Sequence, residues 1–502
     1  MFRALPLLLL LTACASSPVA RLLDRYEQYG FSGAVYATDG ARLLVDDAYG
    51  RGNTRRTGFE VGSVTKTFTA RAVLLLESRG KLRVDDPIAR YIGAVPPDKE
   101  TITLRHLLTH TSGLVPNVWD AAVAKNATRD EMLAAVKASK LLFAPGARTR
   151  YSNTGFTVLA AIIELVSGEP YETFIRREVI APGGLRETGF ADDDLWPQRA
   201  RGIAEPDDEV SGPQQPGPRS WGSHRGAGGI VSTAADLHRW LIAAHPVQSP
   251  LGWFSEKTNL GRAIVYHDGH IPGFRANAIA FAERPLLVAY AINDERFKMP
   301  VGEAVERIVF GDRVLVPPRP RRFAPLEPSR ITGTYAAGDA RIIVRIDNGL
   351  LVAGALGQHA IDLLMNGGRE LPGARATTER TRATLERLAR GEADAELAQW
   401  WRAQCGDRAA ELRGTAPRSP VLLQTFVTCG DTVLRFVWRG DQLAGQGGGV
   451  PAAGTVALRQ YDAHAFVAFE NLLATEVAKL TFGDGTLTTA GETLRRVSED
   501  ER

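Results

Sequence analysis

The chain has 502 residues, of which 44% are hydrophobic and 23% are charged, as in an ordinary soluble globular protein. This length exceeds one typical domain, so we expect two or three domains. The 60 basic and 57 acidic residues give a net charge of +3. That near balance excludes the strong positive field that would indicate a nucleic-acid partner.

The first 20 residues are typical of a targeting signal. One arginine precedes an apolar run from Ala4 to Leu11, which is too short to cross a bilayer as a helix and fits the apolar part of a signal peptide. The sequence Leu-Thr-Ala-Cys at 11–14 resembles a bacterial lipobox, which implies cleavage before Cys14 and lipidation of that cysteine. We therefore expect residues 1–20 to be a lipoprotein signal peptide and tether. An ordinary secretory signal with a chance cysteine is the alternative.

The residue after Cys14 bears on where such a lipoprotein would go. In lipoproteins, a residue other than aspartate at this place generally implies the outer membrane, and here it is Ala15. We expect an exported protein on the periplasmic side, anchored by lipid to the outer membrane. No later apolar stretch reaches about 18 residues, so we do not expect the mature chain to span a membrane.

Strand and helix signals alternate in the first half of the chain. Residues 31–50 predict a β-hairpin, because apolar residues flank the turn signal Asp39-Gly40. A nearly continuous apolar helix is expected from Ser63 to Glu77. Another is expected from about Thr157 to Ser167, with Gly168 as its stop.

The same pattern continues to about residue 293. Residues 232–240 resemble a capping box with Thr233 as N-cap and Asp236 three residues later. Strand-like apolar runs follow at 262–266 and 277–293. Strands near both ends with helices between them predict an α/β layer built from both ends of one domain.

Two segments without periodicity divide the chain. Residues 197–222 are rich in Pro, Gly, Asp and Gln and predict a long surface loop of the kind that often flanks a site. Residues 317–328 are rich in Pro and predict an interdomain linker. We therefore expect a first domain at 21–316 and a second at 329–502.

The second domain is expected to be β-rich, with an α/β insertion at about 374–449. Strand signals surround two hairpin turns, Asp347-Asn348-Gly349 and Asp484-Gly485. Within the insertion, residues 375–404 have helical character, and strands are expected at 421–428 and 432–438.

Cys405 and Cys429 are the only cysteines besides Cys14. In an oxidising compartment, such a pair predicts a disulfide before a metal site. A bridge across 24 steps of chain would contribute roughly 3 kcal/mol of stability. Two unpaired buried thiols are the alternative. Neither cysteine lies near a motif described below, which argues against a cysteine nucleophile.

Three short motifs in the first domain combine residues that can perform acyl chemistry. The first is Gly62-Ser63-Val64-Thr65-Lys66, where the i, i+3 spacing puts Ser63 and Lys66 on one helical face. A serine hydroxyl needs a neighbouring base, and a lysine can be that base only if burial or nearby positive charge lowers its pKa. The apolar helix offers such burial. Alone the motif is weak, because a serine that caps a helix gives the same pattern.

The other two motifs are Tyr151-Ser152-Asn153 and His267-Asp268-Gly269-His270. A tyrosine hydroxyl can shuttle a proton between nucleophile and leaving group when cations hold its pKa down. An asparagine amide can bind both the lysine and a substrate amide. A strand beside the serine can offer backbone N–H groups to an oxyanion, and glycine permits close approach. Read singly, a core tyrosine and a structural histidine also explain these motifs.

Together, the three motifs resemble the serine beta-lactamase and penicillin-binding-protein superfamily, in particular its class C, D-aminopeptidase and esterase branch. Further family-like stretches follow in order at 80–87, 104–114, 143–146 and 228–236, and the resemblance covers about residues 25–310. It implies an α/β (α+β) beta-lactamase/transpeptidase-like domain with an antiparallel sheet flanked by helices. The second domain resembles the lipocalin-like β domains that often follow this hydrolase domain and carries no motif with chemistry.

The resemblance assigns a catalytic role to three residues and a binding role to four. The catalytic residues would be the nucleophile Ser63, its activating partner Lys66, and Tyr151 as general base and acid. The substrate-binding residues would be Asn153, His267, Gly269 and His270. The backbone N–H groups of Ser63 and His270 would form the oxyanion hole.

His267 departs from the family pattern, which has a lysine at this place. An imidazole is mostly neutral at pH 7, so the carboxylate of a beta-lactam or of D-Ala-D-Ala would be held less strongly. Arg275 could supply a carboxylate clamp, although a solvated arginine is the simpler interpretation.

We therefore expect a serine hydrolase that cleaves an ester, amide or peptide bond through an acyl-Ser63 intermediate. A D,D-peptidase or weak beta-lactamase is one alternative, and a non-catalytic cell-wall or ligand-binding sensor is another.

We expect no cofactor and no metal. His106 and His110 stand four residues apart, but two leucines lie between them and no third ligand is evident. The expected partners are a small ester, amide or peptide substrate, with cell-wall fragments among the candidates, and a membrane reached through the lipid anchor. We expect no nucleic-acid partner.

Overall fold

The structure is a computed structural model of the whole chain. It describes residues 17–118, 127–203, 209–210, 221, 225–258, 260–295, 301–314, 316–322, 325–347, 350–365, 368–369, 373–393, 395–419, 422–430, 432–439, 441–448, 456–468 and 478–498. Cys14 and the predicted signal peptide up to residue 16 lie outside the described residues. So do the turn residues Asn348 and Gly349 and parts of the predicted loop and linker.

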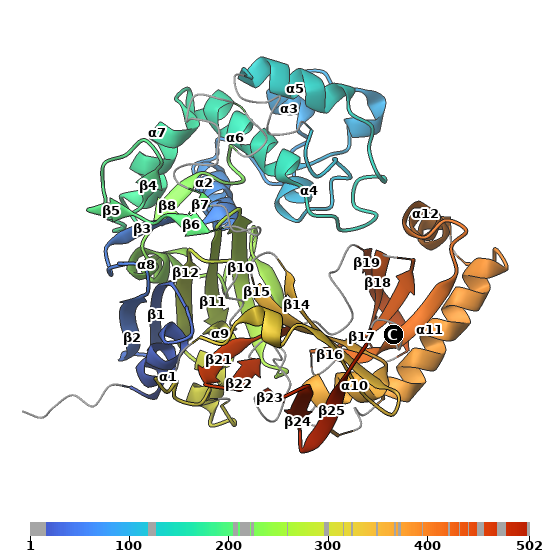
Figure 1. Cartoon of the computed structure of the whole chain (residues 1–502). Helices are drawn as coiled ribbons and strands as arrows, with labels where there is room; N and C mark the ends of the chain where they lie inside the picture. Colours follow the sequence, from blue (N-terminus) through green and yellow to red (C-terminus); the bar gives the residue numbers. More distant parts are fainter. Residues whose placement is uncertain are drawn as a thin grey trace, which may run out of the picture.

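A six-stranded antiparallel sheet forms the centre of the first domain (Figure 1). Its strands lie in the order β2-β1-β12-β11-β10-β9. Their bounds are β1 Gly33–Asp39, β2 Arg42–Tyr49, β9 Phe254–Lys257, β10 Ala263–Ile271, β11 Phe274–Phe281 and β12 Leu286–Ile292. The N-terminal strand pairs with β12, with Gly33 opposite Ile292. The hairpin at 31–50 and the layer built from both ends of the domain are therefore confirmed.

Helices pack on both faces of this sheet. On one face, α1 (Pro18–Glu27) and α9 (Val301–Phe310) share a core with large residues such as Val35 and Val288. On the other face lie α2 (Thr65–Ser78) and α8 (Ala234–Ala244). There the strands β11 and β12 present alanines, whose small side chains let the helices approach closely.

The other elements of the first domain form a helical region beyond the end of the sheet and two small sheets (Figure 1). The helices and helical turns are η1 Gly62–Val64, α3 Ala89–Ile92, η2 Pro97–Lys99, α4 Leu104–Leu108, α5 Arg129–Ala138, α6 Asn153–Ser167, α7 Tyr171–Ile175 and η3 Arg176–Ile180. The strands are β3 Thr57–Glu60, β4 Gly189–Phe190, β5 Gln198–Arg199, β6 Gly202–Ile203, β7 Glu209–Val210 and β8 Ile230–Ser232.

The helix predicted from Ser63 is confirmed, with one difference at its start. The residues Gly62–Val64 form a 3₁₀ turn, and the α-helix begins at Thr65 and ends at Ser78. Most of its residues from Thr65 to Val73 are buried, so Lys66 lies in the interior rather than in solvent.

Two predicted helix starts differ in detail. The helix predicted from about Thr157 is α6, which begins at Asn153 because the hydroxyl of Ser152 caps the N–H of Gly155. It ends at the left-handed Gly168, as expected. Thr233 caps α8, but the carboxylate of Asp236 bonds to Thr188 and to the N–H of Glu187 and does not complete the capping box.

The apolar run at 277–293, expected to be one strand-like segment, holds the end of β11, a turn and β12. The His-Asp-Gly-His motif lies within β10 itself, and Pro272-Gly273 form the turn into β11. In the predicted loop at 197–222, the described residues include the short strands β5, β6 and β7 and the buried Trp221.

The second domain is a nine-stranded antiparallel sheet in the order β20-β15-β14-β13-β25-β24-β23-β22-β21. The bounds are β13 Gly333–Ala337, β14 Ala340–Asp347, β15 Leu350–Leu356, β20 Val456–Ala457, β21 Arg459–Asp462, β22 Ala465–Ala468, β23 Ala478–Gly483, β24 Thr486–Thr489 and β25 Glu492–Val497, with η4 at Pro328–Arg330. Only Leu458 separates the edge strands β20 and β21, so the sheet curls back on itself. The expected hairpin around Asp484-Gly485 is confirmed.

Between β15 and β20 the chain leaves this sheet and forms a four-stranded sheet covered by helices. Its elements are α10 Gln358–Met365, α11 Ala374–Ala389, α12 Ala395–Gln404, β16 Ala410–Ser419, β17 Leu422–Cys429, β18 Thr432–Arg439 and β19 Gln442–Gly448. The helical character expected at 375–404 and the two strands expected after 421 are confirmed.

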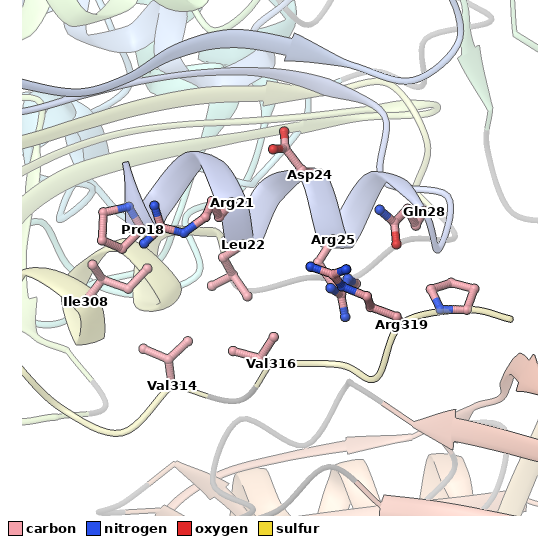
Figure 2. A pocket seen from close by; sticks show the side chains of 11 residues that line it. Pro18, Arg21, Leu22, Asp24, Arg25, Gln28, Ile308, Val314, Val316 and Arg319 are labelled. Atoms are coloured by element: carbon pink, nitrogen blue, oxygen red, sulfur yellow. The ribbon is translucent and has the colours of Figure 1, made fainter. Parts of the chain in front are cut away.

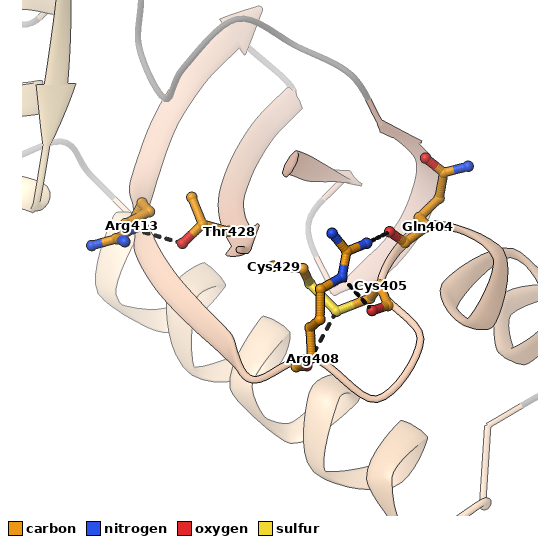
Figure 3. Close-up of a disulfide and its surroundings, with 6 residues drawn as sticks. All are labelled: Gln404, Cys405, Arg408, Arg413, Thr428 and Cys429. Atoms are coloured by element: carbon orange, nitrogen blue, oxygen red, sulfur yellow. Dashed lines mark hydrogen bonds between the residues drawn. A yellow bond between two sulfur atoms is a disulfide. The ribbon is translucent and has the colours of Figure 1, made fainter. Parts of the chain in front are cut away.

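A disulfide joins Cys405, directly after α12, to Cys429 at the end of β17 (Figure 3). The Cα atoms are 5.4 Å apart, and both side chains are fully buried. Arg408 folds over the bridge and donates from Nε to the carbonyl of Cys405 at 2.9 Å. The bridge therefore fastens the helical layer of the insertion to its sheet. Within the described residues, no helix has both the length and the apolar character needed to cross a membrane.

Candidate active site

Three predicted residues meet at one hydroxyl. The Oγ atom of Ser63 lies 3.0 Å from Nζ of Lys66 and accepts a hydrogen bond of 2.6 Å from the hydroxyl of Tyr151. Ser63 lies in the turn η1 directly before α2, Lys66 lies in the first turn of α2, and Tyr151 stands just before α6. Residues 88 positions apart are thus brought within hydrogen-bond distance.

Burial lowers the pKa of Lys66 well below its ordinary value, and the charge of Asp268 opposes this effect. Nζ also contacts Oδ1 of Asn153 at 2.8 Å and the carbonyl oxygen of Ala227 at 2.9 Å. Both of these oxygens can only accept hydrogen bonds. A neutral amine therefore donates its two N–H groups to these oxygens, and its lone pair can accept the proton of the Ser63 hydroxyl. This is the geometry of a base in contact with its proton donor.

The pKa of Tyr151 is too high for a tyrosine that accepts a proton at neutral pH. Burial raises it to about 12, so the hydroxyl carries its proton at neutral pH. Its ring packs against His110, with the ring centroids 4.5 Å apart, and Lys66 Nζ lies 4.8 Å from its centroid. In the resting site, Tyr151 is thus a hydrogen-bond donor to Ser63 rather than a base.

Replacing Tyr151 with phenylalanine is expected to lower kcat by about 10²–10⁴, because a positioned acid–base group contributes that much. The ring contact with His110 remains in this variant, so the melting temperature should stay near the wild-type value. Turnover of a p-nitrophenyl ester and a thermal melt measure both quantities. Wild-type turnover in Tyr151→Phe would show that the hydroxyl takes no part in the reaction.

The strand β10 crosses directly over the turn that holds Ser63. A Cβ placed on Gly269 would lie 1.9 Å from the carbonyl oxygen of Val61 and 3.0 Å from the backbone nitrogen of Ser63. A Cβ on Gly62 would lie 3.0 Å from the backbone nitrogen of His270. Only glycine fits at position 269, and the two backbone segments touch here.

Strand register shows where the N–H of His270 points. The two-residue turn pairs Ile271 with Phe274, and the next pair is His270 with Arg275. Ile271 and Phe274 are the hydrogen-bonded pair that closes the turn. The N–H and C=O groups of the next residue, His270, therefore point away from β11. β9 pairs with β10 only up to Tyr266, so the N–H of His270 faces the turn of Ser63. This is the arrangement expected of an oxyanion hole formed by Ser63 and His270.

His267 lies in the interior beside this edge. Burial and the charge of Lys66 lower its pKa to about 3, although its Nδ1 lies 2.7 Å from the carbonyl oxygen of Asp268. The imidazole is therefore neutral, and the place where the family has lysine holds no positive charge. Asp268 is exposed, and its charge raises the pKa values of both Lys66 and Tyr151, so a carboxylate stands at the mouth of the site.

The remaining predicted residues occupy different places. Asn153 contacts Lys66 and donates from Nδ2 to Oδ1 of Asn117 at 2.9 Å. Arg275 is exposed opposite His270, and its charge acts on Glu295 and Tyr290. His106 caps the start of α4. Within the described part of the chain, no group of three or more His, Cys, Asp or Glu residues could hold a metal ion.

Four residues at the site were not predicted from sequence. They are Asn117, His110, Ala227 and Glu295. Asn117 and Ala227 contribute through a hydrogen bond to Asn153 and a main-chain carbonyl, which leave no motif. His110 supports the ring of Tyr151 and has the left-handed φ of 58°, which no local pattern indicates. Glu295 is hydrogen-bonded to the ring of His270.

An antiparallel sheet between helical layers, with this hydroxyl–amine–phenol cluster at its edge, defines a serine hydrolase. The family model "Beta-lactamase" matches residues 19–310, which is more than half of the chain. The chain therefore belongs to the beta-lactamase family.

Similar proteins of known name span different parts of the chain. Penicillin-binding protein 4* of Bacillus subtilis is 27% identical over 393 residues, which are 67% of this chain and 86% of that protein. Esterase EstB of Burkholderia gladioli is 34% identical over 170 residues, which are 30% of this chain and 43% of the esterase. The octameric penicillin-binding protein homologue from Pyrococcus abyssi has a TM-score of 0.53 at 16% identity and covers 95% of this chain and 98% of its own. That last likeness shows a shared fold across both domains.

Proposed function

We propose that this enzyme hydrolyses esters or amides of small substrates that carry a neutral or cationic group, rather than a carboxylate, next to the scissile bond. The observation that carries this proposal is the charge of the site. His267 is neutral, and Asp268 places a negative charge at the mouth. A substrate carboxylate would meet repulsion there, whereas an ammonium group would be attracted.

The proposed reaction follows the contacts of Ser63. Lys66 takes the proton of the hydroxyl while Oγ attacks the acyl carbon, and the N–H groups of Ser63 and His270 receive the negative charge on the carbonyl oxygen. Tyr151 then gives its proton to the leaving group, which leaves an acyl-Ser63 ester. The proton held by Lys66 restores Tyr151, and water releases the acyl group by the same steps in reverse order.

A substrate panel tests this proposal. Neutral p-nitrophenyl esters and D-amino acid amides should be hydrolysed, nitrocefin and D-Ala-D-Ala peptides poorly, and a fluorophosphonate should label wild type but not Ser63→Ala. Asp268→Asn should narrow the preference for cationic over carboxylate-bearing substrates, whereas Glu283→Gln, an exposed carboxylate elsewhere, should not.

Three results would contradict parts of it. Efficient nitrocefin turnover would favour a beta-lactamase, and preference for D-Ala-D-Ala peptides would favour a D,D-peptidase. A folded protein that binds ligand without labelling or turnover would favour a sensor.

We further propose that the mature protein is tethered by lipid on Cys14, at the periplasmic side of the outer membrane. The support is the lipobox-like sequence at 11–14 and the start of folded structure at Pro18, shortly after it. Radiolabelled palmitate should appear on the wild-type protein and be absent from Cys14→Ala. An unlabelled, freely soluble wild-type protein would disprove the tether.

A further inference from the structure

A pocket of about 850 Å³ lies beneath α1, where α9 and the linker pass it (Figure 2). None of the motif residues of the active site lines it. Its walls include the apolar side chains of Leu22, Ile308 and Val316. Figure 2 shows these side chains facing one another across the gap below α1. Val316, directly before the linker, exposes 58% of its surface, which is a large fraction for an aliphatic residue.

Three arginines, Arg21, Arg25 and Arg319, line the same pocket, against the single carboxylate of Asp24. Figure 2 shows the guanidinium groups of Arg25 and Arg319 at the same end of it. Two like charges in one place favour an anion between them. In addition, Nε of Arg25 is a buried donor that has no hydrogen-bond partner among the described residues. The pocket thus combines an apolar wall with an anion-binding end.

The shape of this pocket is fixed by the linker. Arg25 donates from Nη1 to the carbonyl of Pro317 at 2.7 Å, and the hydroxyl of Tyr29 donates to the carbonyl of Pro318 at 2.7 Å. The linker is therefore held against α1 by contacts within the chain itself. A pre-formed site loses less conformational entropy when it binds.

We propose that this pocket binds an anionic phospholipid, with the phosphate at Arg25 and Arg319 and the start of an acyl chain along Leu22 and Val316. The position of α1 in the chain supports a lipid rather than a free anion. Ser17, the cap of α1, stands three residues after Cys14, and three residues span at most about 10 Å. If Cys14 is lipidated, α1 must lie at the level of the lipid head groups.

Vesicle binding tests the proposal without the anchor. The mature chain with Cys14→Ala is sedimented with vesicles of phosphatidylcholine alone or mixed with phosphatidylglycerol. We expect binding to the anionic vesicles only, weakened by salt. Arg319→Gln should weaken it about fivefold, and Arg25→Gln with Arg319→Gln about 25-fold, because each arginine near an anionic surface contributes about 1 kcal/mol. Arg390→Gln, an exposed arginine of α11's end, is the matched control and should bind as wild type.

Two further measurements distinguish a phospholipid site from a site for free phosphate and from damage to the fold. Val316→Asp should weaken binding to anionic vesicles, because it puts a carboxylate on the apolar wall. Ester turnover in each variant should stay at the wild-type rate, which shows that the fold and the active site are intact. The proposal is overturned by equal binding to both kinds of vesicle, by wild-type binding of the double arginine variant, or by complete release with excess inorganic phosphate at constant ionic strength.

Discussion

Replacing Lys66 with methionine is expected to lower kcat/KM by about 10⁴-fold, the upper end of the range for a positioned base. Methionine fills much of the same buried volume but cannot accept the proton of Ser63. Because Lys66 and Ser63 act as one unit, the double variant with Ser63→Ala should be hardly worse than either single variant. Lys81→Met, at an exposed lysine after the same helix, is the matched control and should keep wild-type turnover.

The pH profile gives a second readout for Lys66. Only the neutral amine is a base, so kcat/KM should rise with pH through the lowered pKa of Lys66 and then form a plateau. Tyr151 does not limit this plateau at ordinary pH, because its pKa is raised to about 12. The rising limb should vanish in Lys66→Met. A decrease of kcat/KM at pH values below 10, caused by loss of the tyrosine proton, would contradict the assignment of the base. So would a pH profile that Lys66→Met leaves unchanged.

The sequence predicts elements well where one local pattern dominates. The helix after Ser63 is apolar on nearly every side, and its burial carries Lys66 into the interior. The hairpin forms where Asp39-Gly40 predicts a turn, although Asp39 pairs with Arg42 across the turn residues Gly40 and Ala41 and a bulge between Ala37 and Thr38 shifts the register. Such patterns are local, so the elements that they predict depend little on contacts with the rest of the chain.

Prediction from sequence fails where a short polar segment changes the pattern. The predicted start of α6 lies four residues late, because Asn153 and Thr154 interrupt the apolar periodicity while Ser152 supplies the cap. The run at 277–293 is predicted as one segment, but Glu283, Arg284 and Pro285 interrupt it and lie in the turn between β11 and β12. The pattern places Asp236 as a cap of its own helix, but a long-range partner, Thr188, takes its carboxylate.

The charge state of the site could not be read from motifs at all. The three motifs place a lysine, a tyrosine and a histidine, but the pKa values of these residues depend on burial and on the mutual distances. Burial lowers the pKa of Lys66, as a base requires, and raises the pKa of Tyr151, so the tyrosine hydroxyl keeps its proton, unlike a tyrosine whose pKa is held down by nearby cations. The carbonyl of Ala227 that contacts Lys66, and Asn117, which contacts Asn153, come from distant parts of the chain.

Gly269→Ala is expected to lower kcat by at least about 10²-fold while the substrate still binds. The added Cβ would meet the carbonyl oxygen of Val61 at 1.9 Å, so β10 must move away from the turn of Ser63. That movement withdraws the N–H of His270 from the developing oxyanion, and the loss of one such donor costs about 3 kcal/mol of transition-state stabilisation.

The matched control for this variant is Gly155→Ala, because a Cβ there meets nothing nearer than 3.6 Å. Stopped-flow acylation with a p-nitrophenyl ester separates the acylation rate from binding, and circular dichroism reports whether the fold persists. A folded Gly269→Ala enzyme that acylates at the wild-type rate would show that the contact between β10 and the serine turn does not build the oxyanion hole. Slow acylation with unchanged affinity would instead place the effect of Gly269 in the transition state, where the backbone of β10 acts without any side chain.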